Sequence, residues 1–410
     1  MRVRPLAFRL VALALGLGMG LVLAGGLGEA WFRYLRRHDF QDCRWSPDPE
    51  IGFVNHVGPC RIRTSEFDVR YEHDRHGFHD DEVTDPRRPV ILALGDSHTW
   101  AVGVSKDEAW PNVLERLLAG GRDPAPAVIN MGVPGYNLGQ EYLLLRRYQH
   151  EFRPRAVVLA FSMATDAYDI RPPRYGGFVY GAEYPRTYFD LDGNGELILA
   201  RGWTTSGERD SASSRLKAFL LERSQLYGAI RRSAAAYYAV RLLRLVGVRA
   251  WPNMDGILAT RLGPADEHSW RLIEKLLRRF REELDAEGIL FTVVVLPYLP
   301  QVYDEVWEKA FGGAGFDRFA GNRRLSLICE AARIDCLDLT PEFVARVRAT
   351  GRYLHFRLDG HANAEGHELI GRRVFEHLRP RLEGGPASVR ALGQGAGRED
   401  ARGGRIAPAP

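Results

Sequence analysis

The stretch Pro89-Val-Ile-Leu-Ala-Leu-Gly-Asp-Ser-His98 decides how this sequence folds. Its apolar first half ends in a Gly-Asp-Ser turn, and short apolar runs of this kind are typical of strands buried on both faces of a parallel sheet. A serine on a tight turn at a strand end is exposed and close to backbone N–H donors. The stretch therefore predicts a strand over residues 89–95 and makes Ser97 a candidate nucleophile, which needs a base to remove its proton. The alternative is a plain polar turn.

Further apolar runs follow along the chain, and helical periodicity separates them. The runs cover residues 127–132, 155–162, 290–297 and 335–339. The helical patterns cover residues 110–118, 138–151, 266–287 and 364–378. Strands that alternate with helices predict a doubly wound α/β fold with a central parallel sheet and right-handed crossovers. In such folds, functional sites form at the carboxyl ends of the strands.

Residues 170–265 interrupt this alternation and form an insertion between the third and fourth predicted strands. Within it, residues 187–200 predict a hairpin around Asp-Gly-Asn-Gly. Helical stretches follow at about 214–222 and 224–246, and we expect the insertion to shape the substrate groove. Residues 384–410 are rich in Gly, Ala and Pro and contain no aromatic residue, which predicts a disordered tail.

The N-terminal segment has the pattern of a membrane anchor. Residues 10–28 are 19 residues without a charge, and spanning a bilayer takes about 20 mostly apolar residues. Arginines precede this run, and aromatic residues follow it at 31–34. We therefore predict a cytoplasmic tip and transmembrane helix over residues 1–37, a lead-in over 38–88 that packs on the main domain, and a catalytic domain over 89–383. The alternative is a cleaved signal peptide.

The distribution of charge argues against a nucleic-acid partner. The net charge is +4, and the first 40 residues supply all of it, with six Arg against Glu29 and Asp39. The remaining 370 residues are balanced, whereas a nucleic-acid binder usually carries a dense basic face. Hydrophobic residues make up 45% and charged residues 26% of the chain, as is ordinary for a globular protein.

The four cysteines, Cys43, Cys60, Cys329 and Cys336, form no Cys-x-x-Cys pair. A zinc or redox motif is therefore not expected. Two short-range disulfides, 43–60 and 329–336, would suit an oxidising compartment. Four buried free thiols are the alternative, and the sequence leaves both open.

A second polar segment lies just before the last predicted helix, where Asp359 and His361 share a turn. A carboxylate two residues from an imidazole can accept its Nδ1–H, which leaves Nε2 to face a serine. The alternative is a helix cap with an incidental histidine. His355, His361 and His367 are spaced six residues apart. This spacing does not put them on one helical face, so we expect no metal here.

Three blocks together resemble the SGNH/GDSL hydrolase superfamily. They are Gly95-Asp-Ser-His-Thr99, Asn130-Met-Gly-Val-Pro-Gly135 and Asp359-Gly-His361, in this order along the chain. The lead-in segment at 71–81 also looks like the one found upstream of the first block in membrane-anchored members. The resemblance implies a three-layer, flavodoxin-like fold.

The resemblance also implies a role for each matched position. Ser97 matches the nucleophile, His361 the general base and Asp359 its orienting partner. The backbone N–H groups of Ser97 and Gly135 match two oxyanion-hole donors. The third donor in the family is usually an Asn side chain, and Thr165 stands in its place. A Thr hydroxyl is shorter than an amide, and losing one oxyanion donor costs about 100–1000-fold in rate.

The resemblance implies a serine esterase that works through an acyl-enzyme and needs no cofactor. Together with the predicted anchor, it implies O-acyl or O-acetyl carbohydrate esters at the cell envelope as the substrate. The catalytic domain would face the periplasm or the exterior. Two alternatives stay open. A polysaccharide O-acetyltransferase would use the same Ser, His and Asp residues, with a sugar hydroxyl in place of water. A non-catalytic carbohydrate-binding protein is favoured only by Thr165.

Overall fold

The computed structural model of the chain falls into two compact units. The first comprises residues 1–41, 62–68 and 205–253, and the second comprises residues 42–61, 69–204 and 254–410. The structure describes residues 16, 18–20, 23–31, 34, 40–120, 124–172, 186–202, 254–311 and 315–383. All residues predicted to carry chemistry lie in the described part of the second unit.

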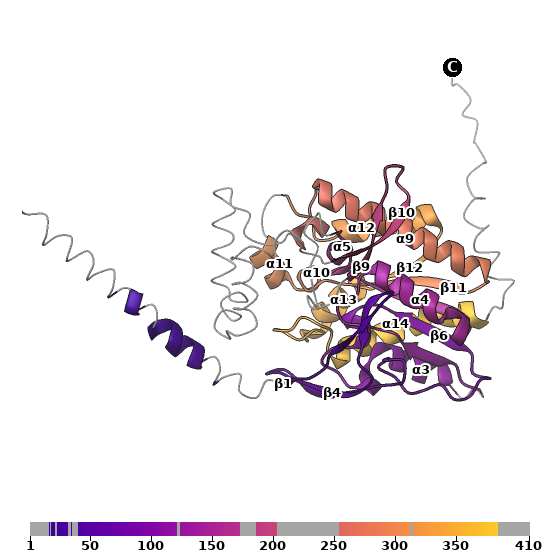
Figure 1. Ribbon diagram of the computed structural model, residues 1–410, viewed down its shortest axis with the longest axis horizontal. Helices are drawn as coiled ribbons and strands as arrows, with labels where there is room; N and C mark the ends of the chain where they lie inside the picture. The colour runs from indigo at the N-terminus through magenta and orange to yellow at the C-terminus, as the bar shows by residue number, and fades with distance from the viewer. Residues whose placement is uncertain are drawn as a thin grey trace, which may run out of the picture. The chain divides into compact units, whose positions relative to one another are not determined.

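A five-stranded parallel sheet forms the centre of the second unit (Figure 1). Its strands are β6 (Val90–Leu94), β7 (Ala127–Asn130), β8 (Ala156–Ser162), β11 (Leu290–Leu296) and β12 (Asp335–Asp338). All five predicted strands are confirmed. The spatial order is β12-β11-β8-β6-β7, so the chain changes direction across the sheet between β6 and β8. Ligands bind at such a switch point in open α/β sheets, and the loops after β6 and β8 carry Ser97 and Thr165.

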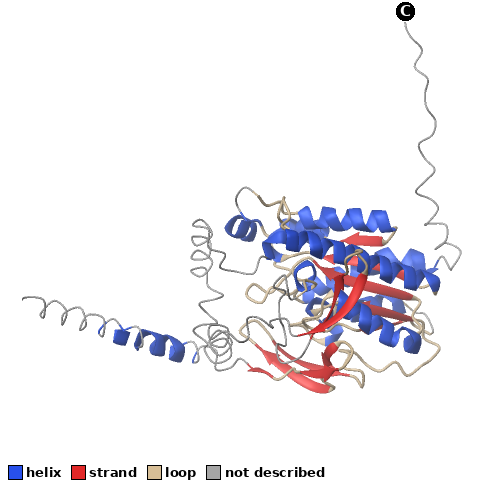
Figure 2. Cartoon of the chain, turned by 45° about the horizontal axis from the view of Figure 1, so that its top comes forward, coloured by secondary structure: helices blue, strands red, loops and turns tan. Residues whose placement is uncertain are grey.

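Helices cover both faces of this sheet, which confirms the predicted three layers (Figure 2). One face packs against α3 (Trp110–Ala119), α13 (Thr340–Thr350) and α14 (Ala364–Glu383). The other face packs against α4 (Leu138–Phe152), α9 (Pro264–Ala286) and α12 (Ala320–Ala332). The four predicted helices correspond to α3, α4, α9 and α14, whereas α12 and α13 were not predicted. The shorter helical elements are α2 (Ser97–Trp100), η1 (Lys106–Glu108), α5 (Asp166–Asp169), η3 (Met254–Ile257), α10 (Leu299–Val302) and α11 (Asp304–Phe311).

The lead-in contains more regular structure than its polar composition indicated. It holds the strands β1 (Phe40–Gln41), β2 (Trp45–Asp48), β3 (Gly52–Asn55), β4 (Gly58–Arg63) and β5 (Asp68–His73). β2 and β3 pair as an antiparallel hairpin, and the others form a sheet in the order β1-β4-β5. Phe53 and Phe78 of this segment belong to the same core cluster as Leu92 of β6. These strands are only two to six residues long, so their pattern is weak in the sequence.

The predicted hairpin of the insertion is confirmed. β9 (Arg186–Leu191) and β10 (Leu197–Gly202) pair antiparallel. In the turn between them, Asp192 accepts hydrogen bonds from the backbone N–H groups of Asn194 and Glu196 at 2.8 and 2.9 Å. The helical stretches predicted at 214–222 and 224–246, and the tail over 384–410, lie outside the described residues.

Much of the predicted anchor over residues 1–37 also lies outside the described residues. Among the residues that are described, no helix has both the length and the apolar character needed to span a bilayer.

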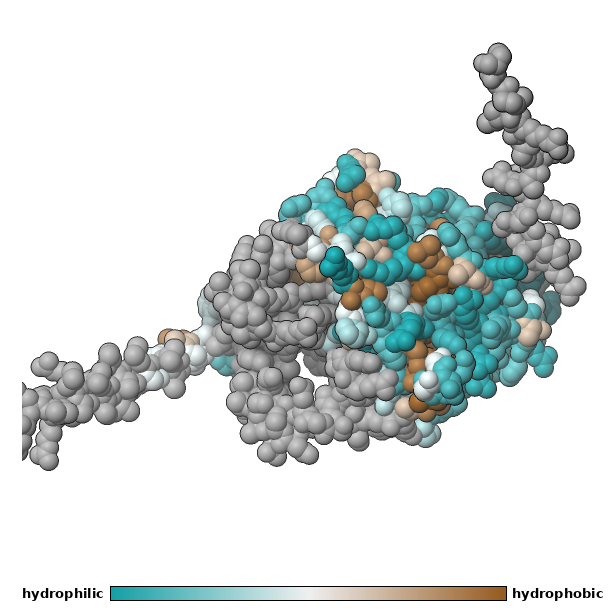
Figure 3. All heavy atoms as spheres, turned by 90° about the horizontal axis from the view of Figure 1, so that it is seen from above, coloured by the Kyte–Doolittle hydropathy of each residue, from teal (hydrophilic) through white to brown (hydrophobic). Residues whose placement is uncertain are grey.

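The cysteines pair as 43–60 and 329–336. Of the two alternatives that the sequence left open, the structure therefore has the disulfides. Among the described residues, apolar side chains gather mainly in two cores, one on each face of the sheet, and a third, small cluster comprises Ala101, Val104 and Ala109. On the face seen in Figure 3, the described surface is mostly hydrophilic, with apolar side chains in small patches.

Candidate active site

Ser97, His361 and Asp359 form one hydrogen-bonded line. Ser97 is the first residue of α2, directly after β6, and His361 lies in the loop before α14. His361 Nε2 is 2.7 Å from Ser97 Oγ, and His361 Nδ1 is 2.5 Å from Asp359 Oδ1. Because a carboxylate accepts the Nδ1 proton, Nε2 is left to accept the Ser97 O–H. Residues 264 positions apart in the chain thus meet in the order serine, imidazole, carboxylate.

Close backbone approaches fix the position of Ser97. Asp96 caps α2 by accepting the N–H of His98 at 2.8 Å. A Cβ on Gly132, in the loop after β7, would lie 2.1 Å from the backbone nitrogen of Trp100. Only glycine lets that loop pack against α2 at this distance. The same loop also donates the N–H of Val133 to the carbonyl of Gly95 at 3.1 Å.

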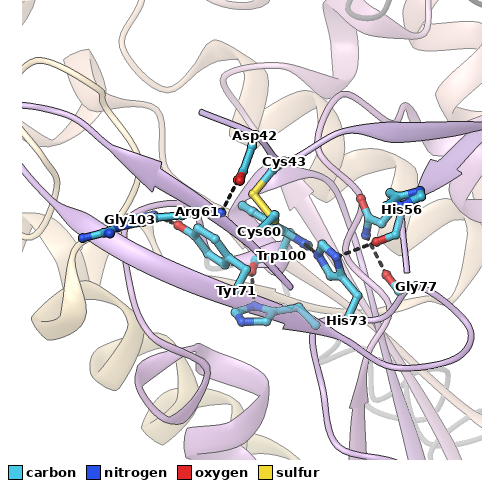
Figure 4. The surroundings of a disulfide bond; sticks show 12 residues. Asp42, Cys43, His56, Cys60, Arg61, Tyr71, His73, Gly77, Trp100 and Gly103 are labelled. Atoms are coloured by element: carbon cyan, nitrogen blue, oxygen red, sulfur yellow. Dashed lines mark hydrogen bonds between the residues drawn. A yellow bond between two sulfur atoms is a disulfide. The ribbon is translucent and has the colours of Figure 1, made fainter. Parts of the chain in front are cut away.

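The other end of α2 rests on aromatic and histidine side chains of β5 (Figure 4). Trp100 Nε1 donates to His73 Nε2 at 2.9 Å. Tyr71 stacks on Trp100 with ring centroids 4.0 Å apart, and its hydroxyl accepts the N–H of Gly103 at 2.7 Å. The Cys43–Cys60 disulfide lies beside this group of side chains. The lead-in therefore supports the helix that begins at Ser97.

The loop that carries His361 is tied to the element that follows β11. The Tyr303 hydroxyl accepts the N–H of Leu354 at 2.9 Å and donates to His355 Nδ1 at 3.0 Å. The carbonyl of His361 accepts the N–H of Phe356 at 2.8 Å. Tyr303 is only 1% exposed, so these bonds are shielded from water and hold the imidazole in place.

The electrostatics suit a base and its orienting partner. Burial lowers the pKa of His361, but the hydrogen bond and charge of Asp359, together with the charge of Asp96, outweigh burial and raise it above 6.5. Burial raises the pKa of Asp359, but the hydrogen bond and charge of His361 outweigh burial and lower it below 3.8. At neutral pH, Asp359 is therefore a carboxylate that stabilises a protonated His361.

The three predicted oxyanion donors differ in whether their proton is available. The N–H of Ser97 lies in the first turn of α2, where helical N–H groups have no acceptor four residues back. Gly135 has a φ of 82° and follows the part of the β7 loop that contacts Gly95. The hydroxyl of Thr165, however, donates to Asp96 Oδ2 at 2.7 Å. Because this bond uses the only hydroxyl proton, Thr165 cannot donate to an oxyanion while the bond lasts.

Two buried carboxylic acids, Glu141 and Asp166, interact electrostatically with Asp96, and Glu141 was not predicted from the sequence. Glu141 of α4 is 1% exposed, and neither of its oxygens has a hydrogen-bond partner in the described part of the chain. Burial raises the pKa of Glu141 well above its usual range, and the charges of Asp96 and Asp169 add to this. Burial and the charges of Glu141 and Asp96 do the same to Asp166, whose Oδ2 accepts the N–H of Ser162 at 2.6 Å. Burial therefore favours the protonated form of both acids.

His355, His361 and His367 are not grouped around one point where a metal ion could bind. His355 Nδ1 bonds to Tyr303, and His367 Nδ1 accepts the N–H of Trp110 at 3.2 Å. Among the described residues, one group of three potential metal ligands lies close together, namely Asp42, Cys43 and Cys60. Its two cysteines are joined in a disulfide and are not free to ligate.

A second imidazole, His98, was also missed. Its ring centroid is 4.6 Å from that of His361, with the planes at 43°. The only signal in the sequence is its place directly after Ser97.

The sequence matches no family model and no curated protein. It is similar to several solved structures. An acetyl xylan esterase is 12% identical, with a TM-score of 0.38, over 70% of this chain and 99% of that one. A lipase/acylhydrolase from Enterococcus faecalis is 14% identical, with a TM-score of 0.37, over 72% and 96%. A carbohydrate acetylesterase family member from Sinorhizobium meliloti is 15% identical, with a TM-score of 0.33, over 72% and 100%.

Proposed function

We propose that this chain is a serine esterase of the SGNH/GDSL type, with Ser97, His361 and Asp359 as its catalytic residues. One observation carries the proposal: the 2.7 Å contact from Ser97 Oγ to His361 Nε2, continued by the 2.5 Å contact from His361 Nδ1 to Asp359. A nucleophile, a base and an orienting carboxylate in hydrogen-bond contact are the signature of nucleophilic acyl transfer.

The reaction follows from these contacts. His361 Nε2 takes the hydroxyl proton as Ser97 Oγ attacks the ester carbonyl. The backbone N–H groups of Ser97 and Gly135 stabilise the resulting oxyanion. His361 then returns the proton to the leaving alcohol, and an acyl group remains on Ser97. Water, activated by the same imidazole, attacks the acyl-enzyme, releases the acid and restores the Ser97 hydroxyl.

The compartment and the substrate are part of the proposal. The uncharged run at residues 10–28 would anchor the chain at the cell envelope. Disulfides persist in oxidising compartments such as the periplasm or the exterior, so the 43–60 and 329–336 pairings support a catalytic domain on that side. Esters available there include O-acyl and O-acetyl carbohydrates, and we propose these as the substrate class.

Labelling with a fluorescent fluorophosphonate tests the nucleophile, because the probe forms a covalent bond only with an activated serine. The full chain should label, Ser97→Ala should not, and His361→Ala should label far more slowly. Ser326→Ala is the matched control, since Ser326 is an exposed helix serine and its loss should leave labelling unchanged. If wild type and Ser97→Ala label equally, the proposal is wrong.

Turnover of an acetyl ester then separates the remaining alternatives. Release of acetate into water that depends on Ser97 supports the esterase. Transfer to an added oligosaccharide, at the expense of acetate release, would support the O-acetyltransferase instead. Absence of both labelling and turnover would leave the non-catalytic carbohydrate-binding protein.

A further inference from the structure

His98 is a second imidazole at the centre of the site. It follows Ser97 in α2, and its ring packs against the His361 ring at 4.6 Å between centroids. Its backbone N–H donates to Asp96. The residue is 8% exposed, and its ring makes no hydrogen bond to any part of the chain that the structure describes.

We propose that His98 is a specificity residue that binds a hydroxyl group on the alcohol portion of the ester. The site would then favour esters of polyols and sugars over esters of simple alkyl alcohols. This inference rests on the proposed function and deepens it, because it identifies the group that recognises the alcohol.

The position of His98 assigns it to the alcohol side of the reaction. His361 Nε2 must lie within hydrogen-bond reach of the leaving oxygen, because it returns the proton to that oxygen. A ring packed against His361 therefore borders the space into which the alcohol leaves. The acyl group lies toward Ser97 Oγ and the oxyanion donors, away from the base.

The chemistry of His98 matches a hydroxyl group. A neutral imidazole offers one donor and one acceptor, and a hydroxyl group needs both. Burial lowers the pKa of His98 to about 4, against the opposing charge of Asp96. His98 is therefore neutral at working pH and keeps its acceptor nitrogen, which a lysine, an arginine or a protonated histidine would lack.

The competing interpretation is that His98 only supports the His361 ring by packing. Phenylalanine separates the two, since it keeps a flat ring of similar size against His361 and removes both nitrogens. A packing role predicts that His98→Phe treats all esters alike. A recognition role predicts that it discriminates by the alcohol.

Two acetate esters with the same acyl group make the test. Glycerol monoacetate carries free hydroxyls on its alcohol, and ethyl acetate carries none. Acetate release is followed in a pH-stat, and the readout is the ratio of kcat/KM for glycerol monoacetate to that for ethyl acetate. We expect His98→Phe to lower this ratio by about 2–13-fold, the equivalent of one net hydrogen bond. His98→Asn or His98→Gln, which keep a donor and an acceptor, should recover part of it.

His150→Phe is the matched control, because this helix histidine has a side chain that is 72% exposed and should leave the ratio unchanged. An unchanged ratio in His98→Phe overturns the inference, whether both rates fall together or neither falls.

If the proposed esterase function is wrong, the results differ from those expected when only the His98 inference is wrong. In that case the wild type cleaves neither ester and Ser97 does not label. Saturation-transfer NMR of glycerol monoacetate with Ser97→Ala then tests His98 without turnover. Binding that weakens when His98→Phe is added supports the inference, and equal binding overturns it.

Discussion

Replacing Thr165 with Val decides what the Thr165 hydroxyl does. The position matches the usual third oxyanion donor, yet the hydroxyl donates to Asp96 Oδ2 at 2.7 Å. Valine keeps the branched shape of the side chain and replaces the hydroxyl with a methyl group. An oxyanion donor and a partner of Asp96 predict opposite results for this one change.

The structure sets the expected magnitudes. Asp96 is 2% exposed, so its carboxylate cannot replace the lost bond with bulk water. A hydrogen bond to a charged group contributes about 1.5–3 kcal/mol, and we expect the free energy of unfolding to fall by that amount. Because Thr165 directs its proton at Asp96, we expect kcat to fall by less than about tenfold, against the roughly 100–1000-fold known for a lost oxyanion donor.

Urea unfolding and turnover of an activated acetyl ester, measured on the same preparations, make the assay. Thr165→Ser keeps the hydroxyl and should retain both stability and rate. If Thr165→Val slows turnover by the full factor expected for a lost oxyanion donor while the unfolding free energy stays unchanged, the reasoning is refuted. The hydroxyl would then act in the transition state and not on Asp96.

The remaining predictions concern the base, the disulfide and one close backbone approach. Asp359→Asn removes the carboxylate that most raises the pKa of His361 and leaves that of Asp96, so the acid limb of the kcat/KM profile should move to lower pH while the rate falls about 10⁴-fold; a limb that stays in place contradicts this. Removing the 43–60 disulfide, which closes a 17-residue separation, should lower the unfolding free energy by about 3 kcal/mol, measured in urea. Gly132→Ala places a Cβ 2.1 Å from the α2 backbone and should impair labelling, whereas Gly193→Ala meets nothing within 4 Å and should not.

The central sheet could be predicted because four of its five strands, β6, β7, β8 and β11, are buried on both faces, whereas β12 is only half-buried. Strands buried on both faces read as unbroken apolar runs, and β8 (AVVLAFS) is buried at every position. Helices that bury a full stripe were equally visible, as in α9. By contrast, α13 buries only Thr340 and Phe343, so it carries no periodic signal. The strands of the lead-in were missed because they are short: β4 and β5 alternate in burial over only six residues each, and β2 and β3 have only four residues each.

The parts of the candidate site that could be predicted are those formed by residues close together in the sequence or at the end of a predicted strand. Asp359 and His361 share one turn, and Ser97 sits at the end of a recognisable strand. The bond between Thr165 and Asp96 joins the loops after β8 and β6, and the sequence shows only that both lie at the same edge of the sheet. Whether the Thr165 hydroxyl donates to Asp96 or to an oxyanion depends on small differences in side-chain position. The spacing of residues in the sequence does not determine such differences.

Asp96 explains how the site can function with Thr165 engaged elsewhere. It accepts the Thr165 hydroxyl at one oxygen and the His98 N–H at the other, and its charge raises the pKa of His361. Raising that pKa favours the imidazolium that forms as Ser97 attacks. In the proposed mechanism, the oxyanion would depend on the backbone N–H groups of Ser97 and Gly135, because the Thr165 hydroxyl donates its proton to Asp96.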